Sequence, residues 1–310
     1  MTRLRIAVLG GDEREVHLAR RLADVGTDCV SFGHASVDGG PPAVAASVAE
    51  AVAGRQWLIC PSPGLADGNR VYAPASAVPI VLDAATLGLT NAPDGGIILG
   101  RVTPEVALAA GRLAIPIFEM KDDRALATRL STGVAEGCMS LLIQLTTRIL
   151  REHRIVLNGY GVTGAVILDY LLGAGCQVAV TARRDTALER ARQRGAAPIR
   201  YDDRVRAFTE AEVIVNTVPD VDAIPTSAFE LLSGRLILDI ASPPGGLDHD
   251  LAAAKGVRVH WARGLAGGRA PETAGDAQFA FVQKVLAMRA PEHLDGPRPA
   301  LTDSDRRSRS

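Results

Sequence analysis

The chain has 310 residues, with 34 Lys or Arg against 35 Asp or Glu and a net charge of −1. This length is sufficient for two domains with a core each, and the balanced charge gives no reason to expect nucleic acid or an anionic membrane as a partner. The four cysteines are scattered without a C-x-x-C pair and no apolar run is long enough to span a membrane, so we expect a cytoplasmic protein without a metal site.

Strands and helices alternate through the first 120 residues. Short apolar runs typical of buried parallel strands occupy 4–9, 29–32, 57–60, 80–82, 96–99 and 115–119. Helical patterns lie between them at 13–25, 43–53 and 104–113. This alternation predicts a parallel, doubly wound sheet.

A helical connection is expected next. A short helix at 123–130 leads to Ser131-Thr132-Gly133, and a long helix follows from Val134 to Glu152. We place the crossing between two domains here. The first, 1–132, would hold the substrate and the catalytic groups, and the last helix, 273–290, would pack back on it. The second, 133–272, would bind a dinucleotide, and 291–310 would form a disordered tail.

The clearest motif is the glycine loop from Gly159 to Gly164, with the spacing G-x-G-x-x-G. It lies between a strand at 155–157 and a helix at 165–173, and a second strand follows at 178–180. In this context Gly159 makes a tight turn, Gly161 lets the backbone approach a pyrophosphate, and Gly164 allows close packing of helix and strand. The alternative is a glycine-rich turn in an ordinary α/β unit, but the context favours dinucleotide binding.

Strands and helices continue to alternate to the end of the folded chain. Strands are expected at 213–216, 236–239 and 258–261, and helices at 185–194, 226–232, 249–255 and 271–288, with Thr226 as an N-cap. The fold class predicted is therefore α/β, with two doubly wound parallel-sheet (Rossmann-like) domains separated by a cleft and joined by a long helix.

The second strand of the dinucleotide unit indicates NADP rather than NAD. An NAD-binding strand usually ends in a carboxylate that accepts from the ribose, whereas here it ends Thr181-Ala182-Arg183-Arg184. Arginine can bind a 2′-phosphate, so we expect Arg183 to be its main ligand with Thr181 and Arg184 assisting. The alternative is that both arginines are solvated surface charges.

The ends of the later strands should lie beside the nicotinamide, although turn chemistry explains Asn, Ser and Pro there equally well. The residues expected to bind the cofactor are Gly159, Tyr160, Gly161, Val162, Thr163, Gly164, Thr181, Ala182, Arg183, Arg184, Asn216, Thr217, Val218, Pro219, Ala241 and Ser242.

The chain resembles the family of the dipicolinate synthase A subunit over nearly its whole folded length. The matching stretches are 6–12 with Arg14, 118–119, 122–123, 134–137, the glycine loop, 182–183, 216–219, 239–242, 244–246, 264–265 and 270–275. The resemblance implies NADP-dependent oxidation of dihydrodipicolinate to pyridine-2,6-dicarboxylate, and a flavoprotein-like B subunit. We also expect a homo-oligomer. The family often has a basic residue where this chain has Pro243, and Arg269 could replace that charge.

The catalytic groups are less clear from the sequence. Hydroxyacid dehydrogenases have a His close to where this chain has Gly264-Leu265, and of the six histidines only His260 is expected near the cleft. Aromatisation of a dihydropyridine needs only a modest base. We expect Glu136 as the base, Arg14 and Arg269 as clamps for substrate carboxylates, and Ser242 beside the reacting ring. Two alternatives stay open, a reductase of a keto or imino acid in a specialised pathway and a non-catalytic NADP-binding subunit.

Overall fold

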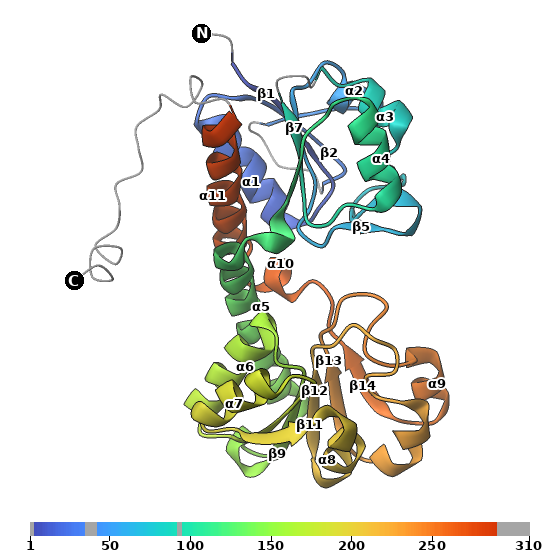
Figure 1. Ribbon diagram of the computed structural model, residues 1–310, viewed down its shortest axis with the longest axis vertical. Coiled ribbons are helices and arrows are strands. Elements are labelled where there is room, and N and C mark those ends of the chain that lie inside the picture. The colour runs from blue at the N-terminus through green and yellow to red at the C-terminus, as the bar shows by residue number, and fades with distance from the viewer. Residues whose placement is uncertain (1–2, 35–41, 92–94, 290–310) are drawn as a thin grey trace, which may run out of the picture. The chain divides into compact units, whose positions relative to one another are not determined.

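The computed structural model describes residues 3–34, 42–91 and 95–289 (Figure 1). The chain divides into two compact units, one made of 1–120 together with the chain from Gln278 onward, and the other of Lys121–Ala277. We call these unit 1 and unit 2. Each contains a six-stranded parallel sheet, so the predicted α/β class with two doubly wound sheets is confirmed. The expected tail, 291–310, lies outside the described residues.

Unit 1 begins with the strand β1 and is built around it. Its strands are β1 (Arg5–Leu9), β2 (Asp28–Phe32), β3 (Ala43–Val44), β4 (Trp57–Ile59), β7 (Gly96–Leu99) and β8 (Ile117–Glu119), in the sheet order β3-β2-β1-β4-β7-β8. Its helices are α1 (Glu13–Asp24), α2 (Val48–Val52), α3 (Ala84–Gly88), α4 (Pro104–Arg112) and the part of α11 (Pro271–Arg289) from Gln278. A small antiparallel hairpin, β5 (Leu65–Ala66) and β6 (Arg70–Val71), is added at one side.

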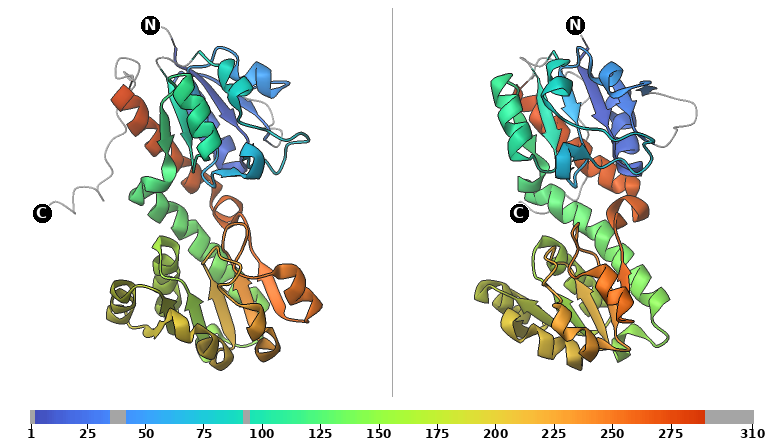
Figure 2. Two further views of the ribbon diagram at one scale, coloured as in Figure 1. Left: turned by 45° about the vertical axis from the view of Figure 1, so that its right-hand side comes forward. Right: turned by 90° about the vertical axis from the view of Figure 1, so that its right-hand side faces the viewer.

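Both faces of the unit 1 sheet are covered by helices. Ala7 and Leu9 of β1 pack in a core with α2, α3 and α4. Because side chains alternate along a strand, Ile6 and Val8 point to the opposite face, and they are equally buried. Figures 1 and 2 show α1 and α11 on that second face.

The α1 and α11 helices contact each other through specific side chains. Asp12 caps α1, and Glu15 completes a capping box with it. Gln278 of α11 donates to the carboxylate of Glu15 at 2.6 Å, and the Arg21 guanidinium lies 4.7 Å from the centre of the Phe279 ring. The final helix is therefore part of the unit 1 core.

Unit 2 repeats the strand order of unit 1. Its strands are β9 (Arg154–Asn158), β10 (Gln177–Ala182), β11 (Ala197–Arg200), β12 (Val213–Asn216), β13 (Leu236–Asp239) and β14 (Arg258–Trp261), in the order β11-β10-β9-β12-β13-β14. Its helices are α5 (Arg124–Leu145), α6 (Val162–Gly173), α7 (Asp185–Gln193), α8 (Arg204–Glu210), α9 (His249–Ala254), α10 (Leu265–Arg269) and the first turns of α11, with a 3-10 helix at Thr226–Leu232.

Two separate cores lie on the two faces of the unit 2 sheet. Ile155 and Leu157 of β9 pack with α5, α6 and α7, whereas Val156 between them packs with α8 and α9. The alternation along this strand therefore assigns the helices to their faces. Both faces are buried, which explains the continuous apolar runs of the parallel strands.

Two expectations for unit 1 are wrong. The helix predicted at 43–53 begins only at Val48, where Ser47 caps it by accepting from the Glu50 amide, and Ala43–Val44 is a short edge strand instead. The strand predicted at 80–82 is reduced to one isolated bridge between Val81 and Arg70.

Unit 2 also differs from the prediction, in its helices and in the number of its elements. One continuous helix, α5, replaces the two helices expected on either side of Ser131-Thr132-Gly133, and it ends at Leu145. The expected crossing at 132–133 falls inside this helix. The segment from Thr226 is a 3-10 helix without a side-chain cap, so Thr226 is not the N-cap. The elements β11, α8 and α10 were not expected from the sequence.

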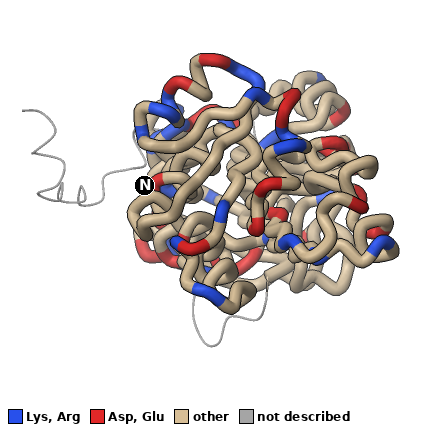
Figure 3. The backbone as a smooth tube through the Cα atoms, turned by 90° about the horizontal axis from the view of Figure 1, so that it is seen from below, with Lys and Arg blue, Asp and Glu red and all other residues tan. Residues whose placement is uncertain are grey.

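None of the helices among the described residues is both long and apolar enough to cross a membrane. Figure 3 shows Lys and Arg interspersed with Asp and Glu over the visible face.

Candidate functional site

The glycine loop of unit 2 has the geometry that its spacing predicts. Gly159 follows β9 with φ +100°, and a Cβ atom there would lie 2.4 Å from the Thr217 hydroxyl oxygen. A Cβ atom on Gly164 would lie 2.3 Å from the Gly159 carbonyl oxygen. Both positions therefore require glycine for the fold itself, one in the turn and one where α6 meets β9.

Gly161 requires glycine for a different reason. It is the N-cap of α6 and provides no side chain to the first turn. A Cβ atom there would meet nothing within 4 Å, so the space in front of the helix N-terminus is open. The amides of that first turn can donate to an anion, and the helix dipole favours negative charge there. The loop accordingly fits a dinucleotide pyrophosphate.

A pocket of about 760 Å³ adjoins this helix N-terminus. We call it the loop pocket. Its lining comes from the glycine loop (Tyr160, Gly161, Val162), from α6, and from four arginines, Arg124, Arg184, Arg190 and Arg194. Arg194 is paired with Asp169 at 3.0 Å. The side chain of Arg184 has no hydrogen-bond or ion-pair partner among the described residues, so it is available to a ligand.

Arg183 is placed differently from the expectation. Its guanidinium pairs with Asp220 at 3.0 Å and lies 4.7 Å from the centre of the Tyr201 ring. Hydrogen bonds to Tyr201 and Asp220 raise the pKa of Arg183. Arg183 does not line the loop pocket, whereas Arg184 does. The geometry therefore favours Arg184 over Arg183 as the phosphate ligand.

A chain of buried hydrogen bonds crosses four neighbouring strand ends. The Thr181 hydroxyl donates to Asn158 at 2.6 Å, the Asn158 amide donates to Asn216 at 2.8 Å, and the Asn216 amide donates to Asp239 at 2.8 Å. All four side chains have no exposed surface. Thr181 and Asn216 thus support the sheet edge, and the expectation that their side chains contact the cofactor does not fit this arrangement.

Asp239 also anchors the loop that contains Ser242. Its carboxylate accepts from the amides of Ala241 at 3.1 Å and Gly246 at 2.8 Å, and it lies 2.9 Å from His249 Nε2. His249 stacks on Trp261 with ring centres 4.1 Å apart. The loop is therefore held at both ends, and Ser242 is exposed between them.

Sequence reasoning missed this network, including the Asp239–His249 pair. One visible pattern could have indicated it, because three buried strands end in Asn158, Asn216 and Asp239 directly after apolar runs. Such side chains at the carboxyl edge of a parallel sheet lie close enough to hydrogen bond to one another.

The remaining expected cofactor residues occupy the same sheet edge. Thr163 hydrogen bonds to Ser131 of α5 at 3.0 Å, and the Thr217 hydroxyl donates to the Asn158 carbonyl at 3.1 Å. Val218 is half-buried and Pro219 exposed, whereas Ala182, Ala241 and the Tyr160 ring are buried. The last three can offer a ligand little beyond their backbone.

Glu136 does not lie where it was expected. The continuous α5 helix places it in the middle of the helix, where it is exposed and accepts from the Tyr170 hydroxyl at 3.3 Å. Tyr170 is eight residues beyond Val162, which corresponds to about 12 Å along α6. Glu136 therefore lies away from the glycine loop and is not supported as the base.

The two arginines expected as clamps already have partners. Arg14 in unit 1 is buried and donates to both carboxylate oxygens of Asp12 at 2.8 Å, and to the Ser62 hydroxyl at 3.1 Å. Nearby carboxylates raise the pKa of Arg14 against the opposing effect of burial. Arg269 in unit 2 donates to Ser140 of α5 at 2.6 Å. Both guanidiniums are thus already hydrogen-bonded to side chains of the protein. His260, the histidine expected near the cleft, is half-buried on β14.

Two Rossmann-like units, one with a phosphate-binding glycine loop, define the class of protein. D-lactate dehydrogenase from Escherichia coli has a similar fold, with a TM-score of 0.61 and 14% sequence identity over 91% of this chain and 96% of that one. The chain therefore has the fold of this two-domain dehydrogenase.

Higher sequence identity is found to the A subunit of dipicolinate synthase. A family model for the N-terminal domain of the dipicolinate synthase A subunit matches residues 5–121. The A subunit of dipicolinate synthase from Bacillus subtilis (strain 168) is 29% identical over 293 residues, which is 93% of this chain and 97% of that protein. A crystal structure of the Bacillus subtilis protein has a TM-score of 0.77 and 27% identity, covering 94% of this chain and 98% of that one. The chain is therefore similar to the A subunit of dipicolinate synthase over nearly its whole length.

Proposed function

We propose that this protein is an NADP-dependent dehydrogenase that oxidises dihydrodipicolinate, or a related cyclic imine or dihydropyridine carboxylate. The observation that supports this most directly is the loop pocket, where the unpaired Arg184 lies beside the open space at Gly161. A guanidinium can bind the three oxygens of a 2′-phosphate, whereas no carboxylate ends β10 to accept from a free ribose 2′-hydroxyl. We therefore assign Arg184 the main part in NADP selection.

The reaction needs little from the protein beyond positioning. When bound, the cofactor supplies a nicotinamide C4 that accepts a hydride, and the ring loses one further proton as it becomes aromatic. The Asp239-anchored loop with Ser242 and the Thr217–Pro219 segment follow β13 and β12, where the nicotinamide half is expected. Their role is to orient the ring and to exclude water from the hydride path.

We propose in addition a cytoplasmic location, a second subunit and a homo-oligomer. The relative from Bacillus subtilis is named as the A subunit of its enzyme, which supports a further subunit for this chain, and the family resemblance suggests a flavoprotein B subunit. All four cysteines are unpaired and buried, and burial raises the pKa of Cys29, Cys60 and Cys138 to about 12, which fits a reducing cytoplasm.

The cofactor assignment is tested by exchanging Arg184 for Gln. We expect the apparent KM for NADP to rise about tenfold or more while the KM for NAD changes less than twofold, because only the 2′-phosphate needs the guanidinium. The assay follows reduced cofactor at 340 nm with dihydrodipicolinate as the substrate, alongside the ultraviolet absorbance of the pyridine product.

Two comparisons make this test specific. Arg206→Gln serves as the matched control, because Arg206 is an exposed arginine of α8 whose one ion-pair partner among the described residues is Glu210. Arg183→Gln measures how much Arg183, which the sequence predicts as the main ligand of the 2′-phosphate, contributes to NADP affinity. Equal losses with NADP and NAD in Arg184→Gln would contradict the cofactor assignment, and NADP binding without turnover of any dihydropyridine would contradict the proposed reaction.

A further inference from the structure

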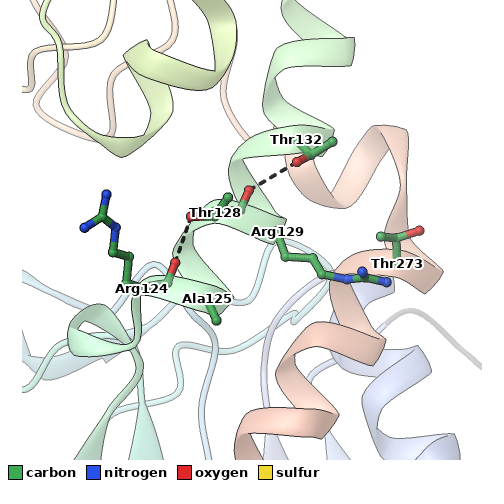
Figure 4. Close-up of a pocket in the computed structure, with 6 residues that line it drawn as sticks. All are labelled: Arg124, Ala125, Thr128, Arg129, Thr132 and Thr273. Carbon is green, nitrogen blue, oxygen red and sulfur yellow. Dashed lines mark hydrogen bonds between the residues drawn. The ribbon is translucent and has the colours of Figure 1, made fainter. Parts of the chain in front are cut away.

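A second pocket of about 660 Å³ lies on the N-terminal half of α5 (Figure 4). We call it the α5 pocket. Its lining consists of Arg124, Ala125, Thr128, Arg129, Thr132 and Thr273, all within unit 2. The five α5 residues form two adjacent rows along the helix, each with a spacing of four residues: Arg124, Thr128 and Thr132 in one, and Ala125 and Arg129 in the other. Thr273 comes from the 270–275 segment that opens α11, and Figure 4 shows the Arg129 side chain extending toward it.

The α5 pocket is positively charged without compensation. Neither Arg124 nor Arg129 has a hydrogen-bond or ion-pair partner among the described side chains, and no carboxylate lines the pocket. Several other exposed arginines of unit 2 are paired, as Arg192 is with Glu189 and Arg200 with Asp185. Two unpaired guanidiniums facing one pocket attract an anion.

Hydroxyl groups complete the donor set. The Thr128 and Thr132 hydroxyls now donate back to the carbonyls of Arg124 and Thr128, at 2.9 Å and 3.2 Å. These carbonyls are also acceptors within the helix, so either hydroxyl can rotate toward a ligand at little cost. With Thr273, the pocket offers hydroxyl donors around the guanidinium of Arg129.

The α5 pocket is continuous with the dinucleotide site. Arg124 and Thr128 line both pockets. Figure 4 shows Arg124 and Arg129 extending from different sides of α5. The pyrophosphate and the 2′-phosphate already have the α6 N-terminus and Arg184 in the loop pocket. An anion in the α5 pocket would then be a separate group, held next to the cofactor.

We propose that the α5 pocket binds a carboxylate of the substrate, with Arg129 as its bidentate ligand and Thr132 and Thr273 as hydroxyl donors. This inference rests on the proposed function, because it assigns a place to the carboxylated substrate of the same reaction.

The test separates carboxylate binding from phosphate binding. Calorimetric titrations measure the Kd of pyridine-2,6-dicarboxylate and, separately, the Kd of NADP. Arg129→Gln is expected to raise the Kd of the dicarboxylate about tenfold and to leave that of NADP within twofold. Arg184→Gln is expected to do the reverse. Arg129→Lys, which keeps the charge without the fork, should recover part of the dicarboxylate affinity, and Arg206→Gln should match the wild type.

Each other outcome has a definite meaning. The inference is wrong if Arg129→Gln leaves both affinities unchanged, if it weakens NADP as much as Arg184→Gln does, or if the wild type binds no dicarboxylate. The proposed function is tested independently, by measuring whether the wild type oxidises dihydrodipicolinate. A protein that binds the dicarboxylate through Arg129 but does not oxidise dihydrodipicolinate would retain the pocket and lose the proposed reaction.

Discussion

Asp239 shows how one residue can organise a ligand-binding edge. It accepts from the side chain of Asn216 and from two loop amides, and it contacts the His249 ring, although none of its surface is exposed. These contacts satisfy the carboxylate oxygens of a side chain that has no access to water. Asp239 therefore fixes the Ser242 loop from below and need not contact the ligand.

His34 is a half-buried polar residue whose ionisation makes the stability of unit 1 depend on pH. It follows β2 in unit 1, and burial lowers the pKa of its imidazole to about 4. An unfolded His has a pKa of about 6.5, so between these values the unfolded chain takes up a proton that folded unit 1 does not. The free energy of unfolding of unit 1 is therefore not reduced by His34 above pH 6.5. It falls by up to about 3 kcal/mol as the pH is lowered from 6.5 toward 4.

Replacing His34 by Gln should remove this acid sensitivity. We expect the free energy of unfolding of unit 1 to fall by about 2 kcal/mol less between pH 7 and pH 4.5 than in the unsubstituted protein. Urea titrations can follow Trp57, which is fully buried in unit 1, in a Trp261→Phe background that removes the other tryptophan. Parallel pH profiles for the two proteins would refute the assignment.

At this scale the sequence predicts backbone roles better than side-chain partners. The structural roles of Gly159 and Gly164 follow from local geometry, because a Cβ atom at either position would be too close to neighbouring atoms. The choice between Arg183 and Arg184 depends on Asp220 and Tyr201, which come from later segments of the chain. The same is true of Glu136, whose surroundings are set by Tyr170. These contacts form only through tertiary packing.

At the scale of elements, the strand–loop–helix motif of unit 2 contains one glycine that we expect to matter for stability, Gly164, and one that we expect to matter for cofactor binding, Gly161. Gly164→Ala would place a methyl group against the Gly159 carbonyl, so we expect a loss of about 1–3 kcal/mol in the stability of unit 2. Gly161→Ala meets open space and has an ordinary φ of −88°, so we expect unchanged stability but a rise of about tenfold or more in the Kd of NADP.

The two glycine variants are controls for each other. Gly164→Ala should lower the thermal stability of unit 2. Gly161→Ala should leave that stability unchanged and weaken NADP binding in a titration. If Gly161→Ala bound NADP normally, the phosphate would have to approach the loop at a different residue.

Element boundaries were predictable where local patterns decide them. The buried strands were found because continuous apolar runs are typical of parallel sheets. The break expected within α5 was wrong because tertiary contacts override the weak helix propensity of Ser131-Thr132-Gly133. Ser131 is buried against Thr163, and Gly137 further along α5 leaves room for Leu265 of α10, whose side chain would lie 3.1 Å from a Cβ atom there.

At the scale of the whole molecule, one contact joins distant parts of the chain inside unit 1. Gln278 donates to Glu15 across 263 residues, and burial raises the pKa of that Glu15 carboxyl. Gln278→Ala should leave a buried acceptor without this donor and cost unit 1 about 1–3 kcal/mol, measured by urea unfolding followed through Trp57. Gln144→Ala, at an exposed position of α5 in unit 2, should leave that transition unchanged.

The division into two units could be predicted only approximately. Two doubly wound sheets follow from alternating strands and helices, and the return of the last helix to the first domain follows from chain order. The chain returns from unit 2 to unit 1 between Ala277 and Gln278, in the middle of the continuous helix α11. No change of composition indicates such a boundary, because the helix itself continues and only its neighbours change.

The course of the chain also determines an order of assembly during synthesis. Unit 2 is a single uninterrupted segment, whereas unit 1 needs its last helix, which is made after all of unit 2. On the ribosome the second unit can finish folding while the first still exposes the apolar surface that α11 will cover. At about 5–20 residues per second, that interval lasts on the order of ten seconds or more. During it, the uncovered apolar surface of the nascent N-terminal unit is the part of the protein most exposed to aggregation.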